Sequence, residues 1–365
     1  MEDQTLTIEN PKAEHGSEHG SNENGSDTMP PDNNSTTTRA ASRTQAASRR
    51  RETARDPISP VGFAGDNSEA SPTVPSNARD VFDYDIPLSE SPGLQGYLEL
   101  IQRRLSGDYP VDEFGCDPIY AQMWWPLFEQ LYRNYWRVDT VGVENVPSSG
   151  RAMVVANHSG GSYAWDAVMM STAIHLEHPR PRYVHYVSTE FFYDSPFLSF
   201  DNRKKGAALA CREDFVRLLE RELVVGVFPE GVKGFLKPND KRYQVQRFGR
   251  GGFVQLALAT RTPIVPVSVV GGEELHFALG NSKLLARIVN SMIPQERADS
   301  FPILLNWIPL PIKWRIEFGE VIDVSKYGPE AARDTLLVNH LTEQVRAKIQ
   351  EGLDRNLALR RSMFW

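Results

Sequence analysis

The sequence is poor in cysteine, in long apolar runs and in excess positive charge. Cys116 and Cys211 are its only cysteines, so no disulfide framework or cysteine-rich metal site is expected and a reducing compartment is favoured. No run of about 18 uninterrupted apolar residues occurs, so no transmembrane helix is predicted, and the N-terminus lacks the basic-then-apolar pattern of a signal peptide. The formal net charge of -7 argues against a nucleic-acid binder, which usually presents a basic face.

Large apolar side chains are scarce in residues 1–78, where Ser, Thr, Asn, Asp, Glu, Gly and Pro dominate. Such a segment cannot bury enough apolar surface to offset the entropy of ordering it. We therefore predict a disordered tail over residues 1–78, a helical preamble over residues 79–136, and one domain over residues 137–365. The informative motifs of that domain lie within about residues 150–275.

The preamble contains two helical patterns, at residues 96–105 and from Pro118 onward. In the second, aromatic and apolar residues recur at spacings of three and four, the period of one helix face. This face fits packing onto the domain, which we expect, or contact with a membrane interface, where Trp and Tyr are favoured. Its members are Tyr120, Trp124, Phe128, Leu131, Tyr132 and Tyr135.

The remainder of the chain alternates short apolar runs with helical patterns. This alternation predicts an α/β fold, a sheet with helices on its faces. Strands are expected at residues 137–141, 152–156, 223–228, 264–270 and 314–318, and helices at about residues 164–175, 212–222, 250–260 and 329–360.

A histidine follows the apolar strand at residues 152–156, inside a glycine-rich turn. His158 placed in this way can project into a cleft, and Asp166 a few residues later can hold its imidazole in one tautomer and stabilise the charged form. These are the requirements of a general base that removes a proton from a hydroxyl. Taken alone, the pair also fits a structural histidine in a turn.

A second polar segment follows the apolar strand at residues 223–228. Glu230 interrupts the apolar run, Gly231 permits a tight turn, and Lys233 supplies a cation able to meet a phosphate. An ordinary strand-to-loop turn with solvated Glu and Lys side chains is the alternative.

Two further segments complete a series of four. Gly206 to Arg212 brings a cation that can bind an anion or simply begin a surface helix, and Ile264 to Val267 is a buried apolar run that contains a proline. In this order the four segments resemble the conserved blocks of the phospholipid/glycerol acyltransferase family: His-x4-Asp, a Gly-x5-Arg-like block, Phe-Pro-Glu-Gly, and an apolar block with proline. The resemblance covers about residues 137–275.

The resemblance implies a glycerol-3-phosphate acyltransferase-like fold with a mixed or mostly parallel sheet. It implies His158 as the base and Asp166 as its orienting partner, with Glu230, Gly231, Lys233 and Arg212 helping to place the acceptor. It also implies acyl-CoA or acyl carrier protein as donor, a glycerolipid hydroxyl such as that of lysophosphatidate as acceptor, and no metal or bound cofactor. The expected location is cytoplasmic, at the cytoplasmic face of a membrane.

Two departures from the family pattern bear on the acceptor. Seven residues separate His158 from Asp166, instead of four, as in the longer loops of diacylglycerol- and monoacylglycerol-acyltransferase-like relatives. Lys233 stands where lysophosphatidate acyltransferases usually have an arginine, and lysine lacks the planar two-point grip on phosphate. A neutral acceptor such as diacylglycerol therefore remains an alternative, as does a non-catalytic lipid-binding protein on the same fold.

Three weaker patterns have competing interpretations. A metal site at His175, His178 and His185 is disfavoured by the absence of cysteine and the nearby prolines, and we expect a plain loop there. The basic, glycine-rich residues 246–253 fit either a phosphate site at a helix N-terminus or an ordinary cap. Residues 301–311 are too short and proline-rich to span a bilayer, but suit a membrane surface or the wall of an acyl tunnel.

Overall fold

The computed structural model describes residues 94–107, 111–159, 163–189, 198–292 and 300–364. The predicted tail of residues 1–78 and the start of the preamble lie outside these residues. The described helices include none that is both long and apolar enough to cross a membrane.

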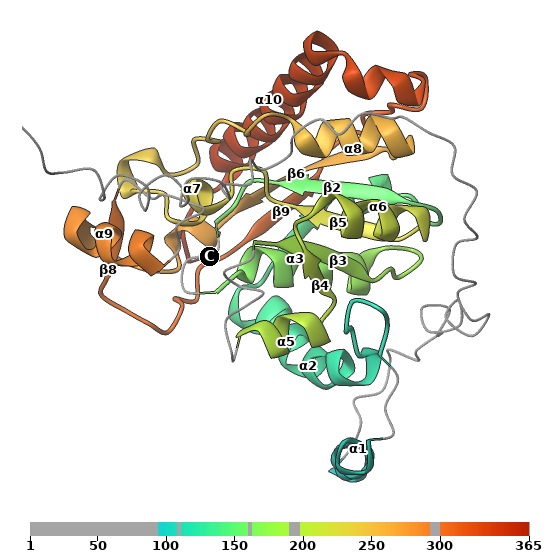
Figure 1. Cartoon of the computed structure of the whole chain (residues 1–365). Coiled ribbons are helices and arrows are strands. Elements are labelled where there is room, and N and C mark those ends of the chain that lie inside the picture. The colour runs from blue at the N-terminus through green and yellow to red at the C-terminus, as the bar shows by residue number, and fades with distance from the viewer. Residues whose placement is uncertain (1–93, 108–110, 160–162, 190–197, 293–299, 365) are drawn as a thin grey trace, which may run out of the picture. The chain divides into compact units, whose positions relative to one another are not determined.

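A seven-stranded mixed sheet forms the centre of the domain (Figure 1), in the order β1-β9-β6-β2-β5-β3-β4. Strands β2 to β6 are mutually parallel, whereas β9 runs antiparallel to β6 and β1 runs parallel to β9. The prediction of a mixed, mostly parallel sheet is confirmed. The strands are β1 Asp139–Val141, β2 Ala152–Ala156, β3 Val184–Ser188, β4 Ala207–Leu209, β5 Val224–Val227, β6 Ile264–Val270 and β9 Arg315–Phe318.

Helices cover both faces of this sheet. On one face, α2 (Pro118–Gln130) and α3 (Trp165–Glu177) enclose an apolar core. On the other, α6 (Arg212–Glu220), α8 (Gly252–Thr260) and α10 (Thr335–Leu359) enclose a second. Because both faces are covered, β2, β5 and β6 are buried along their whole length, which is why they read as continuous apolar runs.

The aromatic face of α2 packs into the domain rather than facing outward. Phe128 of α2 and Tyr132 of the π-helical turn Leu131–Tyr135 that follows it are buried, and Trp125 stacks on His175 of α3 with ring centroids 4.0 Å apart. The helix begins where the Asp117 carboxylate accepts a hydrogen bond from the Tyr120 amide, ahead of a proline in its first turn. Of the two interpretations of this face, core packing is confirmed.

Two local predictions were wrong. The segment expected to be a plain loop contains the end of α3 and the strand β3, where His185 is fully buried and its Nδ1 lies 3.2 Å from the Gly206 carbonyl oxygen. The last long helix starts at residue 335, not 329, because Asp334 caps it by accepting from the amides of residues 336 and 337. Residues 329–333 form a separate 3-10 helix.

A small unit follows β6 and was not predicted. It comprises β7 (Ala278–Ser282), α9 (Lys283–Met292) and β8 (Phe301–Leu304), and its two strands pair antiparallel. The remaining α-helices among the described residues are α1 (Leu94–Ser106), α5 (Leu198–Lys204) and α7 (Val232–Phe235).

Candidate active site

The carboxyl ends of three neighbouring parallel strands meet at one edge of the sheet, the usual place for a site in such folds. β2 lies between β5 and β6, so His158, Glu230 and Glu273, which follow β2, β5 and β6, are brought together. Asn157 fixes the end of β2, because its buried amide side chain donates to the Val269 carbonyl (3.1 Å) and accepts from the Val269 amide (2.8 Å).

The structure brings His158 and Asp166 into direct contact despite the long loop between them. The His158 Nδ1 atom lies 2.6 Å from Asp166 Oδ2. Asp166 is fully buried in the first turn of α3, where the helix dipole favours a negative charge, and it also accepts from the amides of Ser159 (2.7 Å) and Ala167 (2.9 Å). With Nδ1–H donating to the carboxylate, the imidazole lone pair lies on Nε2, as a general base requires.

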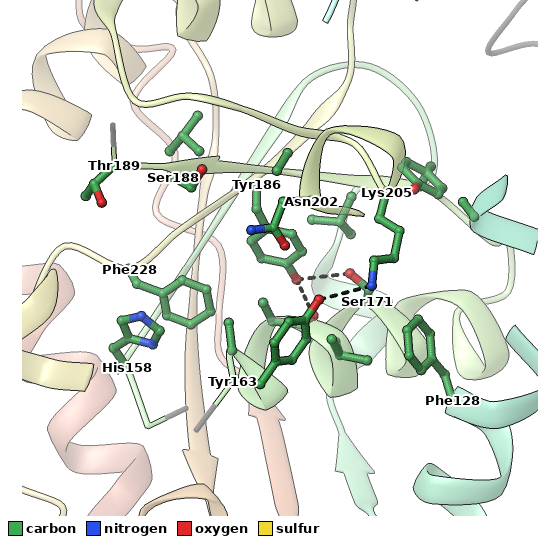
Figure 2. Close-up of a pocket in the computed structure, with 18 of the residues that line it drawn as sticks. Phe128, His158, Tyr163, Ser171, Tyr186, Ser188, Thr189, Asn202, Lys205 and Phe228 are labelled. Atoms are coloured by element: carbon green, nitrogen blue, oxygen red, sulfur yellow. Dashed lines mark hydrogen bonds between the residues drawn. The ribbon is translucent and has the colours of Figure 1, made fainter. Parts of the chain in front are cut away.

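The His158 ring stacks on Phe228, with centroids 4.4 Å apart and planes at 22°. The imidazole is 13% exposed and lines a cavity on the α2–α3 side of the sheet (Figure 2). Packing on one face and the carboxylate at Nδ1 restrict the ring to one orientation, so Asp166 and Phe228 together position it.

Glu230 lies behind His158 and supports its backbone. Its Oε1 accepts from the His158 amide (2.9 Å), and its Oε2 accepts from the Gln246 amide (2.7 Å). The residue is 4% exposed. Glu230 was expected among the substrate-binding residues, but this geometry favours positioning of the histidine.

A buried lysine that was not predicted from the sequence lies between the carboxylates of two glutamates in this region. Lys237 Nζ lies 3.2 Å from Glu230 Oε2 and 2.7 Å from Glu273 Oε1, and its side chain is 3% exposed. Glu273 also accepts from the Tyr243 amide (2.6 Å). Burial raises the pKa of the Glu273 carboxyl, and the Lys237 charge opposes that rise. The available sequence signal was a glutamate after each of two predicted strands, β5 and β6, with lysines, Lys237 among them, between the two glutamates in sequence.

Two glycines allow the close approach of these segments. Gly231 has φ 57° and ψ −148°, a conformation essentially restricted to glycine, and it lines the cavity. A Cβ on Gly234 would lie 2.5 Å from the Glu230 Cβ and 2.9 Å from the His158 Cβ. Gly234 was not singled out from the sequence, since its constraint comes from neighbours in space.

The other two predicted substrate-binding residues lie apart from the cavity. Lys233 is exposed on α7, and Arg212 is exposed at the first position of α6. Neither belongs to the residues that line the cavity.

The cavity walls are mostly apolar and aromatic, and they come from α2, α3, β3 and the end of β5. Figure 2 shows His158 and Phe228 at one end and Phe128 and Lys205 at the other, with Tyr163 between them. Lys205 Nζ lies 2.5 Å from Asp201 Oδ2 and donates to Tyr163 Oη at 3.0 Å. Burial lowers the pKa of Lys205, and Asp201 opposes that shift.

The three histidines considered for a metal make other contacts. His175 stacks on Trp125, His178 Nε2 lies 2.7 Å from the Val146 carbonyl oxygen, and His185 contacts the Gly206 carbonyl oxygen. Burial lowers the pKa of His175 and of His185 to about 4. Within the described ranges, no group of three or more His, Cys, Asp or Glu side chains is placed to hold a metal ion.

Comparison with known proteins identifies the family of the domain that contains this site. The family model described as Acyltransferase matches residues 137–270, which contain His158, Asp166 and Glu230. The chain belongs to the acyltransferase family. It is therefore an O-acyltransferase, and the resemblance to an acyltransferase family inferred from its four motifs is confirmed.

The relatives of this acyltransferase fall into two groups. An uncharacterised protein of Mycobacterium tuberculosis is 43% identical over 269 residues, 73% of this chain and 74% of that protein, and one of Mycobacterium leprae is 42% identical over 286 residues, 77% of each. A chicken protein named "DGAT1/2-independent enzyme synthesizing storage lipids" is 25% identical over 209 residues, 57% of each.

Among solved structures, the chain is similar to the 1-acyl-sn-glycerophosphate acyltransferase PlsC of Thermotoga maritima. The sequence identity is 19% and the TM-score is 0.43, and the match covers 73% of this chain and 90% of that one.

Proposed function

We propose that this acyltransferase moves a fatty acyl group from a thioester, on coenzyme A or acyl carrier protein, to a hydroxyl of a glycerolipid. The observation that carries the proposal is the buried His158–Asp166 pair, with 2.6 Å between Nδ1 and Oδ2, at one end of an apolar cavity. An oriented base beside an apolar cavity suits an acceptor hydroxyl and a donor with a long hydrocarbon chain.

In the proposed reaction, His158 Nε2 takes the proton of the acceptor hydroxyl while that oxygen attacks the thioester carbonyl. The new carbon–oxygen bond forms the ester, the carbon–sulfur bond breaks, and the imidazolium returns its proton to the departing thiolate. Asp166 stabilises the imidazolium through Nδ1–H, in a site where burial strengthens the charge–charge interaction. The chemistry needs no metal or bound cofactor.

The cavity is suited to the acyl chain. Its walls include Trp125 and Phe128 of α2, Val168 of α3 and Tyr186 of β3. Tyr186 does not present a free hydroxyl to the chain, since that group donates to the Ala167 carbonyl (2.8 Å) and accepts from a serine of α3. Burying a hydrocarbon chain against such walls contributes about 0.8 kcal/mol per methylene.

The distribution of cations favours an uncharged acceptor, such as diacylglycerol, over lysophosphatidate. Of the described residues that line the cavity, one is a lysine and none is an arginine. That lysine, Lys205, lies at the end of the cavity away from His158. Lys237 is compensated by two carboxylates, and Lys233 is exposed on α7. The name of the chicken relative, which refers to storage-lipid synthesis, is consistent with this acceptor.

The proposed setting is the cytoplasmic face of a membrane, with the protein bound peripherally. Acyl-CoA and acyl carrier protein are water-soluble donors, whereas the acceptor is a lipid, so the reaction requires an enzyme at the boundary between them.

Release of thiol from acyl-CoA by the purified protein tests this proposal, with lysophosphatidate, with diacylglycerol and with neither. We expect release that depends on an acceptor, and faster release with diacylglycerol. Lys233→Ala should leave the diacylglycerol reaction unchanged. A strict requirement for lysophosphatidate, with a raised KM for it in Lys233→Ala, would reverse the choice of acceptor. No acceptor-dependent release would favour the lipid-binding alternative.

A further inference from the structure

Exposed apolar side chains gather on the small unit that follows β6. Among the residues described, 20 large apolar side chains are exposed, and eight of them lie between residues 277 and 308. We call six of these the hairpin surface: Leu279 (71% exposed), Leu284 (67%), Ile288 (52%), Leu305 (62%), Trp307 (79%) and Ile308 (78%). Such a concentration marks an interaction site, whereas single exposed apolar residues do not.

The most exposed part of this surface is held in a fixed loop. The Asn306 side chain accepts from the Phe277 amide (2.8 Å) and donates to the carbonyls of Leu275 (3.0 Å) and Ile308 (2.7 Å). Leu275 is fully buried, so the loop is tied to the core. Trp307 and Ile308 are thus presented outward without the entropic cost of ordering a mobile segment on binding.

The sequence of the small unit is basic, although the whole chain is acidic: residues 275–314 contain four lysines and arginines against Glu296 and Asp299. Residues 275–292 and 300–314 contain Lys283, Arg287 and Lys313 and no aspartate or glutamate. Lys283 and Arg287 are exposed on α9, one helical turn apart and next in sequence to Leu284 and Ile288. Apolar side chains flanked by lysine and arginine on one short helix are typical of a segment that lies in a bilayer interface.

The small unit that carries the hairpin surface lies at the same end of the sheet as the active site. β6 pairs with β2 and ends beside His158, and a Cβ on Gly272, two residues after the end of β6, would lie 2.3 Å from the Ser159 Oγ. α9 and β8 lie at that end of the sheet, beyond α7 (Figure 1). A bilayer in contact with this unit therefore adjoins the place where the acceptor must arrive.

We propose that the hairpin surface docks the enzyme onto an anionic lipid bilayer and so orients the active-site edge toward the membrane. This inference rests on the proposed function for the reason why docking is useful to the enzyme. The exposed apolar side chains and the cations that support it do not depend on that function. Sequence analysis left residues 301–311 as either a membrane surface or the wall of an acyl tunnel. Their exposure and their absence from the cavity lining favour the membrane surface.

Co-sedimentation of the full-length protein with vesicles tests the docking without any substrate. The vesicles are phosphatidylcholine alone, and phosphatidylcholine mixed with phosphatidylglycerol in equal parts. The wild type should bind the mixed vesicles more tightly, with the difference reduced at high salt. Trp307→Glu with Ile308→Glu should weaken binding to both vesicles at least tenfold. Lys283→Gln with Arg287→Gln should weaken binding to the mixed vesicles alone, by roughly fivefold per residue.

Two matched controls make the result specific. Leu336→Glu with Leu359→Glu alters two exposed leucines of α10 (82% and 60% exposed) and should leave binding unchanged. Leu105→Glu alters the most exposed leucine of α1 (85% exposed) and should also have no comparable effect. The inference would be overturned if the Trp307 variant bound vesicles as tightly as the wild type, or if only Leu105→Glu abolished binding. It would also be overturned if the Trp307 variant converted a dimer to a monomer but still bound vesicles normally.

Activity separates this inference from the proposed function. With acceptor dispersed in detergent, thiol release by the Trp307 and Lys283 variants should equal that of the wild type, because neither change touches the catalytic site. If the wild type releases no thiol under these conditions but the vesicle results hold, then the proposed reaction fails and the docking stands.

Discussion

Replacement of Glu230 by glutamine separates a positioning role from a substrate-binding role. Glu230 accepts from the His158 and Gln246 amides through different oxygens, and a glutamine of the same shape offers one acceptor atom. One buried amide then faces the glutamine NH2 group without an acceptor, and Lys237 keeps only Glu273 as an anionic partner.

The magnitude follows from these two losses. An unsatisfied buried donor costs about 1–3 kcal/mol, and removal of one of the two carboxylates from a buried lysine increases the total to about 2–5 kcal/mol. For a domain of this size, that range lowers Tm by roughly 5–15 °C. Because Glu230 holds the His158 backbone, a displacement of the imidazole by about 1 Å is expected to lower kcat up to about a hundredfold.

The assay combines thermal unfolding with the kinetics of thiol release at varied acceptor concentration. Glu273→Gln is the matched control, because it weakens the same lysine network and faces the Tyr243 amide but does not contact His158. We expect both variants to lose thermal stability, and only Glu230→Gln to lose kcat strongly. The reasoning is refuted if Glu230→Gln keeps the wild-type Tm and kcat but raises the acceptor KM.

Three further predictions follow from the geometry. Gly234→Ala should lower both Tm and kcat, since the added methyl meets the Cβ of His158 at 2.9 Å, and wild-type values would contradict that packing. Val168→Phe should narrow the cavity and reduce kcat/KM more for long than for short acyl chains. An equal loss at every acyl-chain length would mean that the acyl chain binds outside this cavity. Burial holds the pKa of His175 and His185 near 4, below the ordinary 6.5, so the unfolded state takes up protons first as the pH falls. Urea titrations should therefore show the free energy of unfolding declining from about pH 6.5 to about pH 4, by up to about 3 kcal/mol per histidine. The decline should be less steep in His185→Gln.

All five predicted strands are present: β1 and β9 were predicted from alternating polar and apolar residues, and β2, β5 and β6 from complete burial. β2, β5 and β6 lie inside the sheet with helices on both faces, so each must be a continuous apolar run. β3 was missed because His185 and Tyr186 make it look polar, although both side chains find partners inside the protein. β7 and β8 were missed because they form a two-stranded unit in which no residue is buried, so burial imposes no apolar run on their sequences.

The site could be predicted where chemistry and local sequence coincide. His158 and Asp166 are separated by one loop, and a strand end followed by glycine marked their position. Lys237 was missed because its role depends on two carboxylates that the sheet brings together, one of them 36 residues away in sequence. Lys233 was chosen instead as a cation able to meet a phosphate, at the position where lysophosphatidate acyltransferases usually have an arginine, but it is exposed on α7.

The central claim is that His158 is the base, and one comparison tests it most directly: thiol release from acyl-CoA by purified His158→Ala beside the wild type, with thermal unfolding of both. General-base catalysis typically contributes about 10²- to 10⁴-fold in rate. The account predicts a loss of turnover in that range by a variant that stays folded, and a smaller loss for Asp166→Asn, which keeps the base without its charged partner. A folded His158→Ala protein with wild-type turnover would contradict it.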